Sequence, residues 1–130
     1  MAQLSDWAEK AALDWLMGGA NPTRPTARYL ALFTAAPNDA GGGTEMSGGG
    51  YARQALTCDA ATSGAGACSN SNAPSFTISG VNPAPFTHIG IFDASSAGNL
   101  IWHGALTASK DLDDGDTINF AVGELDFTLA

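Results

Sequence analysis

The fold of this 130-residue chain is decided by residues 29–55, which read YLALFTAAPNDAGGGTEMSGGGYARQA. The stretch begins within a predicted strand over residues 28–34, in which apolar side chains occupy both faces, as in a strand buried on both sides. A long loop with two triple-glycine runs follows over residues 35–50, and residues 51–58 then alternate between two faces like an amphipathic strand. This order predicts a rigid β-domain that carries one long loop.

The rest of the chain has the turn spacing of a β-protein with one helix. Apolar residues at helical spacing predict a helix over residues 5–17, capped by Ser5 or Asp6, inside an N-terminal segment 1–19 that ends on a glycine pair. Short strands between turn clusters are predicted at residues 75–78, 86–93, 99–105, 117–122 and 124–129. The sequence therefore predicts one mainly β domain over residues 1–130, a β-sandwich or jelly-roll-like fold with an N-terminal helix.

The charge of the chain argues against two classes of partner. The chain has 5 Lys and Arg residues and 13 Asp and Glu residues, which gives a net charge of −8. The basic residues are scattered along the sequence. Phosphate groups and anionic membranes attract clustered basic residues, so we expect neither nucleic-acid nor membrane binding. The N terminus lacks the basic and apolar regions of a signal peptide, which predicts synthesis in the cytosol without export by that route.

The low fraction of charged residues indicates a chain that associates with other chains, which then cover part of its surface. Only 14% of residues are charged, against about 25% in average soluble domains. In the predicted helix, Trp7 and Trp15 lie close to one face, where they either cover an open end of the β-core or anchor the helix on a neighbouring subunit. The second candidate interface is the loop, where a partner would offset the entropy cost of ordering Gly41, Gly42, Gly43, Gly48, Gly49 and Gly50. The alternative for the loop is a mobile segment without a role.

No motif supports catalysis, a cofactor or a metal ion, so we predict no catalytic, cofactor-binding or metal-binding residues. The glycine runs lack the Lys-Ser/Thr ending of a phosphate-binding loop, and no serine lies in a Gly-x-Ser-x-Gly elbow. The acidic residues 111–116 depart from EF-hand spacing, which favours a hairpin turn with solvated carboxylates over a calcium site. A zinc site that used His88 or His103 would have no Cys-x-x-Cys motif beside it.

Cys58 and Cys68 flank a short glycine-rich segment and could face each other across a hairpin. A disulfide between them would stabilise the fold by up to about 3 kcal/mol, mainly by restricting the unfolded chain. Because the cytosol keeps thiols reduced, the bond would form after release from the cell. Two free, half-buried thiols are the alternative.

The segments YLALFTAAP, GGGTE and GGGYARQA within residues 29–55 resemble a family of small tailed-bacteriophage virion proteins, and the resemblance extends from the N-terminal helix to the last strand. Members of that family carry the labels tail-fibre protein or head-decoration (cement) protein. The resemblance implies a structural protein of the virion, made in the host cytoplasm, and not an enzyme. With the low charged fraction it also implies a homo-oligomer, expected to be a trimer, whose other partner is the major capsid protein or, alternatively, tail proteins.

Two positions in the particle compete. Small size and the lack of a repetitive shaft favour a capsid decoration or cement protein that stabilises the head, and we place this first. The family label favours a tail-fibre or tail-tip subunit. A third hypothesis, from a different class, is a carbohydrate-binding module that uses Trp102, Tyr51 or His103 on an exposed face.

Overall fold

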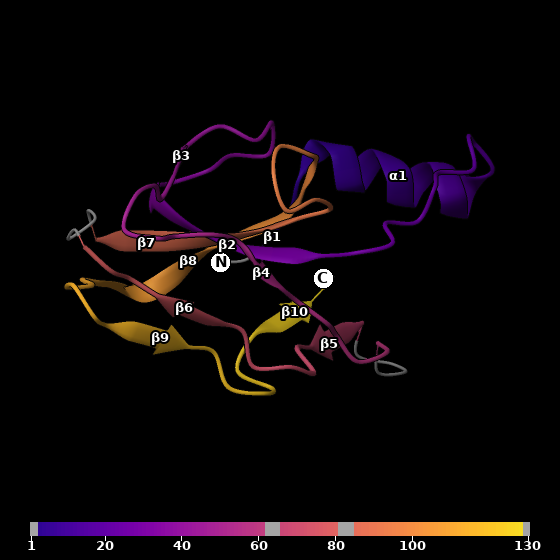
Figure 1. The fold of residues 1–130 in the computed structure, drawn as a ribbon. Helices are drawn as coiled ribbons and strands as arrows, with labels where there is room; N and C mark the ends of the chain where they lie inside the picture. The colour runs from indigo at the N-terminus through magenta and orange to yellow at the C-terminus, as the bar shows by residue number, and fades with distance from the viewer. Residues whose placement is uncertain (1–2, 62–65, 81–84, 129–130) are drawn as a thin grey trace.

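The structure is a computed structural model and describes residues 3–61, 66–80 and 85–128. Within these residues, two layers of antiparallel strands enclose the core, and one helix lies near an end of the larger layer (Figure 1). The larger layer is a sheet with the neighbour order β1-β8-β7-β2-β3, and β4 also pairs with β2. Its strands are β1 (Gln3–Leu4), β2 (Tyr29–Ala35), β3 (Thr44–Glu45), β4 (Gln54–Ala55), β7 (Phe86–Phe92) and β8 (Leu100–Lys110).

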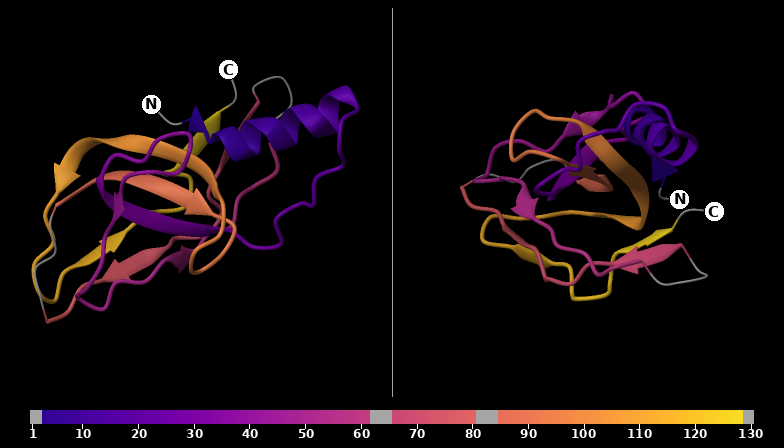
Figure 2. Two further views of the ribbon diagram at one scale, coloured as in Figure 1. Left: turned by 90° about the horizontal axis from the view of Figure 1, so that it is seen from above. Right: turned by 90° about the vertical axis from the view of Figure 1, so that its right-hand side faces the viewer.

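The smaller layer is built from strand pairs that lie below the large sheet in Figure 1, and Figure 2 shows the same separation of layers from another side. One pair joins β5 and β10, and the other joins β6 and β9. The bounds of these strands are Ala67–Ser69 (β5), Ser75–Thr77 (β6), Thr117–Asn119 (β9) and Asp126–Thr128 (β10). The predicted mainly β, sandwich-like fold with one N-terminal helix is confirmed.

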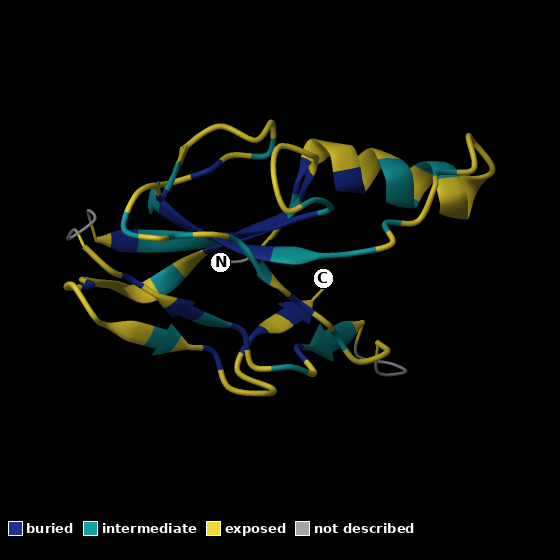
Figure 3. Ribbon diagram, viewed as in Figure 1, coloured by how far each residue is buried: buried dark blue, intermediate teal, exposed yellow. Residues whose placement is uncertain are grey.

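Strand β2 is buried on both faces, as its sequence predicts. Leu30 and Leu32 belong to the main core between the layers, and Ala31 and Phe33 belong to a smaller cluster on the other face of the sheet. Figure 3 shows buried residues along β2 and exposed residues over most of the helix. The main core joins side chains from both layers, among them Ile91, Trp102, Phe76, Phe120 and Phe127.

The helix α1 spans Asp6–Met17 and is fixed at its start to the large sheet. Ser5 is its N-cap: the hydroxyl accepts a hydrogen bond from the Ala8 amide at 3.2 Å and donates one to the Leu100 carbonyl of β8. Gly18 ends the helix in the left-handed region with φ of 84°. Of the two expected caps, Ser5 is therefore the one used.

Several strands differ in extent from the prediction. Residues 51–58 do not form one strand, because this segment crosses between the layers: Gln54–Ala55 pairs with β2, and Cys58 pairs with Asn70. Strand β8 continues past the predicted end at Ala105, since it stays paired with β7 as far as Lys110. Strands β1, β3 and β5 were not predicted because two or three residues are too short to show periodicity. Residues 62–65 of the turn between the cysteines, and Leu129 at the end of the last predicted strand, lie outside the described residues.

Candidate interaction surfaces

The glycine-rich loop, residues 35–50, is folded onto the large sheet by contacts within the chain. Glu45 of β3 pairs with Phe33 of β2, and the Met46 amide donates to the Leu32 carbonyl at 2.8 Å. The Met46 side chain lies in the main core. The loop therefore does not need an outside partner to become ordered, and contact between its glycines and another chain stays a prediction.

One position in the loop requires glycine. Gly43 has φ of 91°, and a Cβ there would lie 2.7 Å from both the Ala36 carbonyl oxygen and the Pro37 nitrogen. The turn before β3 can therefore close only around a residue without a side chain. The glycines of the candidate interface are exposed apart from Gly49, which is half-buried, so the structure leaves them accessible.

The side chain of Arg53, which is only 8% exposed, ties the loop to its surroundings. The Arg53 guanidinium donates to both carboxylate oxygens of Glu45, at 2.8 Å each, and to the carbonyl oxygens of Ala94 and Ala97 at 2.9 and 2.8 Å. The same group lies over the Phe92 ring, with Cζ 3.6 Å from the ring centroid. The bidentate pairing with Glu45 fixes the Arg53 side chain in one geometry. Arg53 thus joins the loop, the end of β7 and the turn that follows it.

Tyr51 adds a further donor to the same carboxylate. Its hydroxyl donates to Glu45 at 2.8 Å and accepts from the Leu32 amide at 3.1 Å. Burial would raise the pKa of Glu45, but the hydrogen bonds from Arg53 and Tyr51, with the guanidinium charge, lower that pKa below its ordinary value of 4.5. Burial also raises the pKa of Tyr51, which keeps the hydroxyl protonated as a donor.

A second carboxylate holds the middle of the loop against the start of the helix. Asp39 Oδ1 accepts from the Gln3 side chain at 2.6 Å and lies 2.9 Å from His103 Nε2. The main-chain oxygen of Asp39 accepts from the Asp6 amide at 2.9 Å. The hydrogen bond with His103, and after it the bond with Gln3, lowers the pKa of Asp39 below its ordinary value of 3.8. The loop, β1, β8 and α1 therefore meet at this side chain.

We expect the fold to lose stability in acid as Glu45 and Asp39 become protonated. Both folded-state pKa values lie below the unfolded values of 4.5 and 3.8, so both contributions are complete above about pH 4.5 and are lost as the pH falls through the lowered pKa values. Urea unfolding from neutral pH to about pH 3 measures this loss. Glu45→Gln should reduce the pH dependence, whereas Asp111→Asn, at an exposed carboxylate, should not. Equal pH dependence in the wild type and Glu45→Gln would contradict the assignment.

The last turns of α1 carry large apolar side chains in solvent. The exposed fractions there are Leu13 61%, Trp15 68%, Leu16 66% and Met17 80%. Only the earlier part of the helix packs on the body, through buried Ala8 and half-buried Ala11 and Ala12. Figures 1 and 2 show the end of the helix extending beyond the sheets.

The two helix tryptophans differ in exposure. Trp15 is too exposed to cover the β-core, so that interpretation is wrong for Trp15. Trp7 is 37% exposed and therefore only partly packed. Contact of either tryptophan with a neighbouring subunit stays a prediction.

A groove of about 470 Å³ runs along the inner face of α1. Its opposite wall is formed by residues 21–25 and Ile101. Arg24 lines this groove, is exposed, and forms no ion pair with any residue that the structure describes. The helix side of the groove consists of Trp7, Ala8, Ala11, Ala12 and Trp15.

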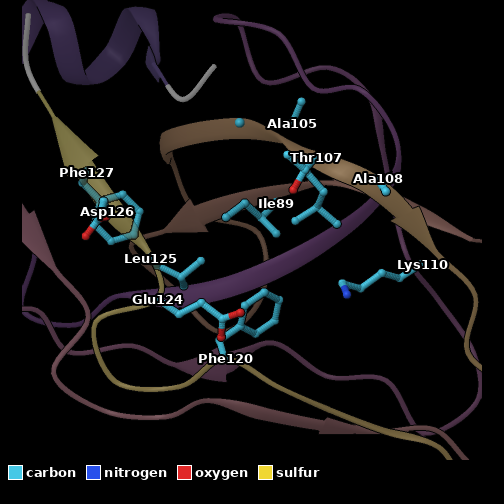
Figure 4. A pocket seen from close by; sticks show the side chains of 12 residues that line it. Ile89, Ala105, Thr107, Ala108, Lys110, Phe120, Glu124, Leu125, Asp126 and Phe127 are labelled. Atoms are coloured by element: carbon cyan, nitrogen blue, oxygen red, sulfur yellow. The ribbon is translucent and has the colours of Figure 1, made fainter.

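The cleft in Figure 4 lies between β8 and residues 120–127 and has a volume of about 390 Å³. Its two carboxylates already accept hydrogen bonds within the chain: Glu124 from the Ala121 amide at 2.7 Å, and Asp126 from the Ser69 hydroxyl at 2.6 Å. Both come from the same segment. A glycosidase instead places its two carboxylates on either side of the bond to be cleaved. The cleft therefore gives no support to that chemistry.

The aromatic residues considered for sugar binding do not form an exposed platform. Trp102 and His103 are buried, and Trp102 packs edge-to-face against Phe127 with ring centroids 5.8 Å apart. Tyr51 is half-buried and stacks on Phe76, also at 5.8 Å. The expectation that these residues lie on an exposed face is wrong for Trp102 and His103. Trp102 packs in the main core, and His103, on the opposite face of β8, is covered where it meets Asp39 of the loop.

The acidic residues 111–116 connect β8 of the large sheet to β9 of the smaller layer, so the expected hairpin turn is wrong. Two of the carboxylates accept from main-chain amides: Asp116 from Asp113 at 2.8 Å, and Asp114 from Gly80 at 2.7 Å. Across residues 3–61, 66–80 and 85–128, no three His, Cys, Asp or Glu side chains gather as metal ligands. In the same part of the chain no helix is long and apolar enough to span a bilayer.

Cys58 and Cys68 both line one cavity of about 420 Å³, and both thiols are free in the structure. The bridge between Cys58 and Asn70 continues with a hydrogen bond from the Asp59 amide to the Ser69 carbonyl at 2.9 Å. This antiparallel register puts the two cysteines on one face of neighbouring segments. Burial, and after it the neighbouring Cys68 thiol, raises the pKa of Cys58.

We predict that mild oxidation joins the two cysteines. Because exchange needs a thiolate and the pKa of Cys58 is raised, the bond should form faster as the pH rises above neutral. Treatment with oxidised glutathione, followed by thiol counting and mass spectrometry, should show the loss of two thiols and two hydrogens. In Cys58→Ser the remaining thiol should instead carry glutathione. If both thiols of the wild type carry glutathione and no bond forms between them, the pairing is wrong.

Comparison with known proteins gives a match to a family model. The family described as podophage GP4 fiber I protein gp80 matches residues 3–128. No curated protein matches the chain.

Proposed function

The chain belongs to the family of the podophage GP4 fiber I protein gp80, and from this premise we propose that it is a subunit of a fibre on the tail of the phage particle. Membership makes it a structural protein of a phage virion. The observation that carries the finer assignment is the family's description as a fibre protein, together with a match that covers residues 3–128.

The surfaces of the molecule support a role in contact rather than in catalysis. The sandwich holds its long loop rigidly through Glu45 and Arg53, and the exposed end of α1 offers apolar surface. Its proposed partners are further copies of the chain, in a trimer, and other tail proteins. The net charge of −8 supports partners other than nucleic acid or membrane. We also propose that the chain is made in the host cytoplasm, where phage particles are assembled.

Capsid decoration is the second candidate. Its support is the absence of a shaft: residues 3–61, 66–80 and 85–128 form a short two-layer body. The sequence alone places this role first, and the family description now favours the fibre instead. The major capsid protein would be the partner in this case.

Antibody labelling of purified particles separates the two roles. Gold-labelled antibody against the chain should decorate the tail, and particles from a phage with the gene deleted should lose label and fibre together. Label spread over the head would contradict the fibre and support decoration. Particles without any label, from lysates that contain the chain, would overturn both roles.

A further inference from the structure

The cavity of about 420 Å³ that the two cysteines line lies between the layers, at the end of the sandwich where β5 and β10 lie (Figure 1). Its large apolar side chains come from both layers: Ile91 of β7, Ile101 and Trp102 of β8, and Phe127 of β10. The small residues at positions 60, 61, 66 and 67 also line it. Ligand pockets in proteins have volumes of about 300–1,000 Å³ and a mainly apolar wall with a few polar groups. The cavity has the size and the wall of such a pocket.

The polar groups at this cavity are mainly positive. Arg24 and Arg28 both line it, and neither forms an ion pair with a residue that the structure describes. The Arg28 guanidinium donates to the Pro25 carbonyl at 3.5 Å, which is long for a hydrogen bond. Asp59 is the one carboxylate among the described residues of the wall, so one negative group stands against two guanidinium groups. Because burial raises the pKa of Cys58, that thiol adds no charge at neutral pH.

We propose that this cavity binds a small amphiphile, with an unbranched hydrocarbon tail between the layers and an anionic head group beside Arg24 and Arg28. Guanidinium groups bind carboxylate and phosphate alike through paired hydrogen bonds, so a free fatty acid and a lipid phosphate share the required chemistry. The apolar wall favours a hydrocarbon over a peptide. A peptide main chain would bring N–H and C=O groups for which this wall has few partners, and burying them unpaired costs free energy.

The charge of the whole chain makes the placement of these arginines informative. A net charge of −8 repels anions over most of the surface, and only 5 residues are Lys or Arg. Two of them line this one cavity. Binding of a single amphiphile in a cavity also differs from binding to an anionic membrane surface, which needs basic residues spread over a face of the protein. The cavity is therefore a local site for an anion on a chain that otherwise repels anions.

The test is the binding of dodecanoate, below its micelle concentration, to the full chain, followed by tryptophan fluorescence. Of the 3 tryptophans, only Trp102 lines this cavity, so Trp7→Phe and Trp15→Phe are introduced first to leave Trp102 as the reporter. Dodecanoate should change the Trp102 fluorescence and reach saturation. From octanoate through decanoate to dodecanoate, each added methylene should tighten binding by up to about fourfold, the effect of burying one CH₂ group, for as long as the cavity has room.

The head group is tested with one variant and its control. Arg28→Gln should weaken dodecanoate binding by about tenfold or more, because a hydrogen-bonded charge is lost. Lys110→Gln is the matched control, since it removes the same charge from an exposed side chain that does not line the cavity. Dodecanol, with the same tail and no charge, should also bind more weakly than dodecanoate. Tighter binding of dodecyl phosphate than of dodecanoate would indicate a lipid phosphate as the head group, and the reverse a free fatty acid; either order supports the site.

Alkylation of the two thiols by iodoacetamide provides a measurement on the unchanged chain. Dodecanoate should slow the alkylation of Cys58 and Cys68, because the tail would cover the cavity that they line, whereas acetate should have no effect. Faster alkylation would mean that dodecanoate unfolds the protein and would overturn the proposal. So would a lack of saturable binding, equal binding of dodecanol and dodecanoate, or equal affinities of Arg28→Gln and Lys110→Gln. These outcomes concern the cavity alone, so they leave the position of the chain in the particle to the labelling experiment.

Discussion

Phe76→Ala should lower the free energy of unfolding by about 3–5 kcal/mol, the usual cost of truncating a fully buried phenylalanine. Phe76 is 2% exposed and stacks on Tyr51, and it meets the edge of Phe120 with ring centroids 6.2 Å apart. Phe76 therefore connects β6 to two other segments: it contacts Phe120, which follows β9, and Tyr51, which follows the glycine-rich loop. Since typical domains are stable by about 5–15 kcal/mol, the variant should be close to unfolding at 37 °C.

Urea unfolding at a fixed protein concentration measures this loss, because self-association would otherwise change the apparent stability. Val122→Ala is the control: it removes apolar atoms from an exposed side chain and should change stability by no more than about 0.5 kcal/mol. A loss below about 1 kcal/mol for Phe76→Ala would mean that the two layers are not packed as described.

Arg53→Ala should destabilise the fold by about 3 kcal/mol, the lower end of the cost of breaking a buried ion pair. The Arg53 side chain is only 8% exposed, whereas Glu45 is 27% exposed, so water can partly solvate the carboxylate that is left. The variant also leaves the carbonyls of Ala94 and Ala97 without their donor and uncovers the Phe92 ring. Hydrogen exchange should rise in the loop residues 35–50.

Lys10→Ala provides the comparison, because Lys10 forms an ion pair with Asp14 on the surface of α1 and its side chain is 75% exposed. Such a pair contributes about 0.3–0.5 kcal/mol to stability. The two alanine variants should therefore differ several-fold in how much free energy of unfolding they lose. Similar losses for Lys10→Ala and Arg53→Ala would show that Arg53 does not hold the loop.

The parts of the fold that periodicity governs could be predicted from the sequence. Apolar residues on both faces of residues 28–34 indicate a strand buried on two sides, which β2 is. Ser5 and Gly18 mark the ends of α1 by known capping chemistry. Contacts without a spacing rule could not be predicted: the pairing of Glu45 with Arg53 and of Asp39 with His103 depends on how the loop folds back.

The helix shows where sequence reasoning missed candidate residues. Trp7 and Trp15 are candidates because tryptophan is enriched at interfaces. Trp15 is indeed exposed, but so are its neighbours Leu13, Leu16 and Met17, which were not named as candidates. The signal was present in the sequence: five of the six residues 12–17 are apolar, with Asp14 as the exception, which is unusual for a surface helix. Only the structure shows that this half extends beyond the sheets and stays uncovered.

A cryo-electron microscopy map of the intact phage particle locates the chain directly. If the chain is a fibre subunit, the map should contain density for this two-layer sandwich in a tail fibre, with the exposed end of α1 covered by a neighbouring copy. Density for the sandwich at the head surface, or a complete map of head and tail with no place for the chain, would contradict it.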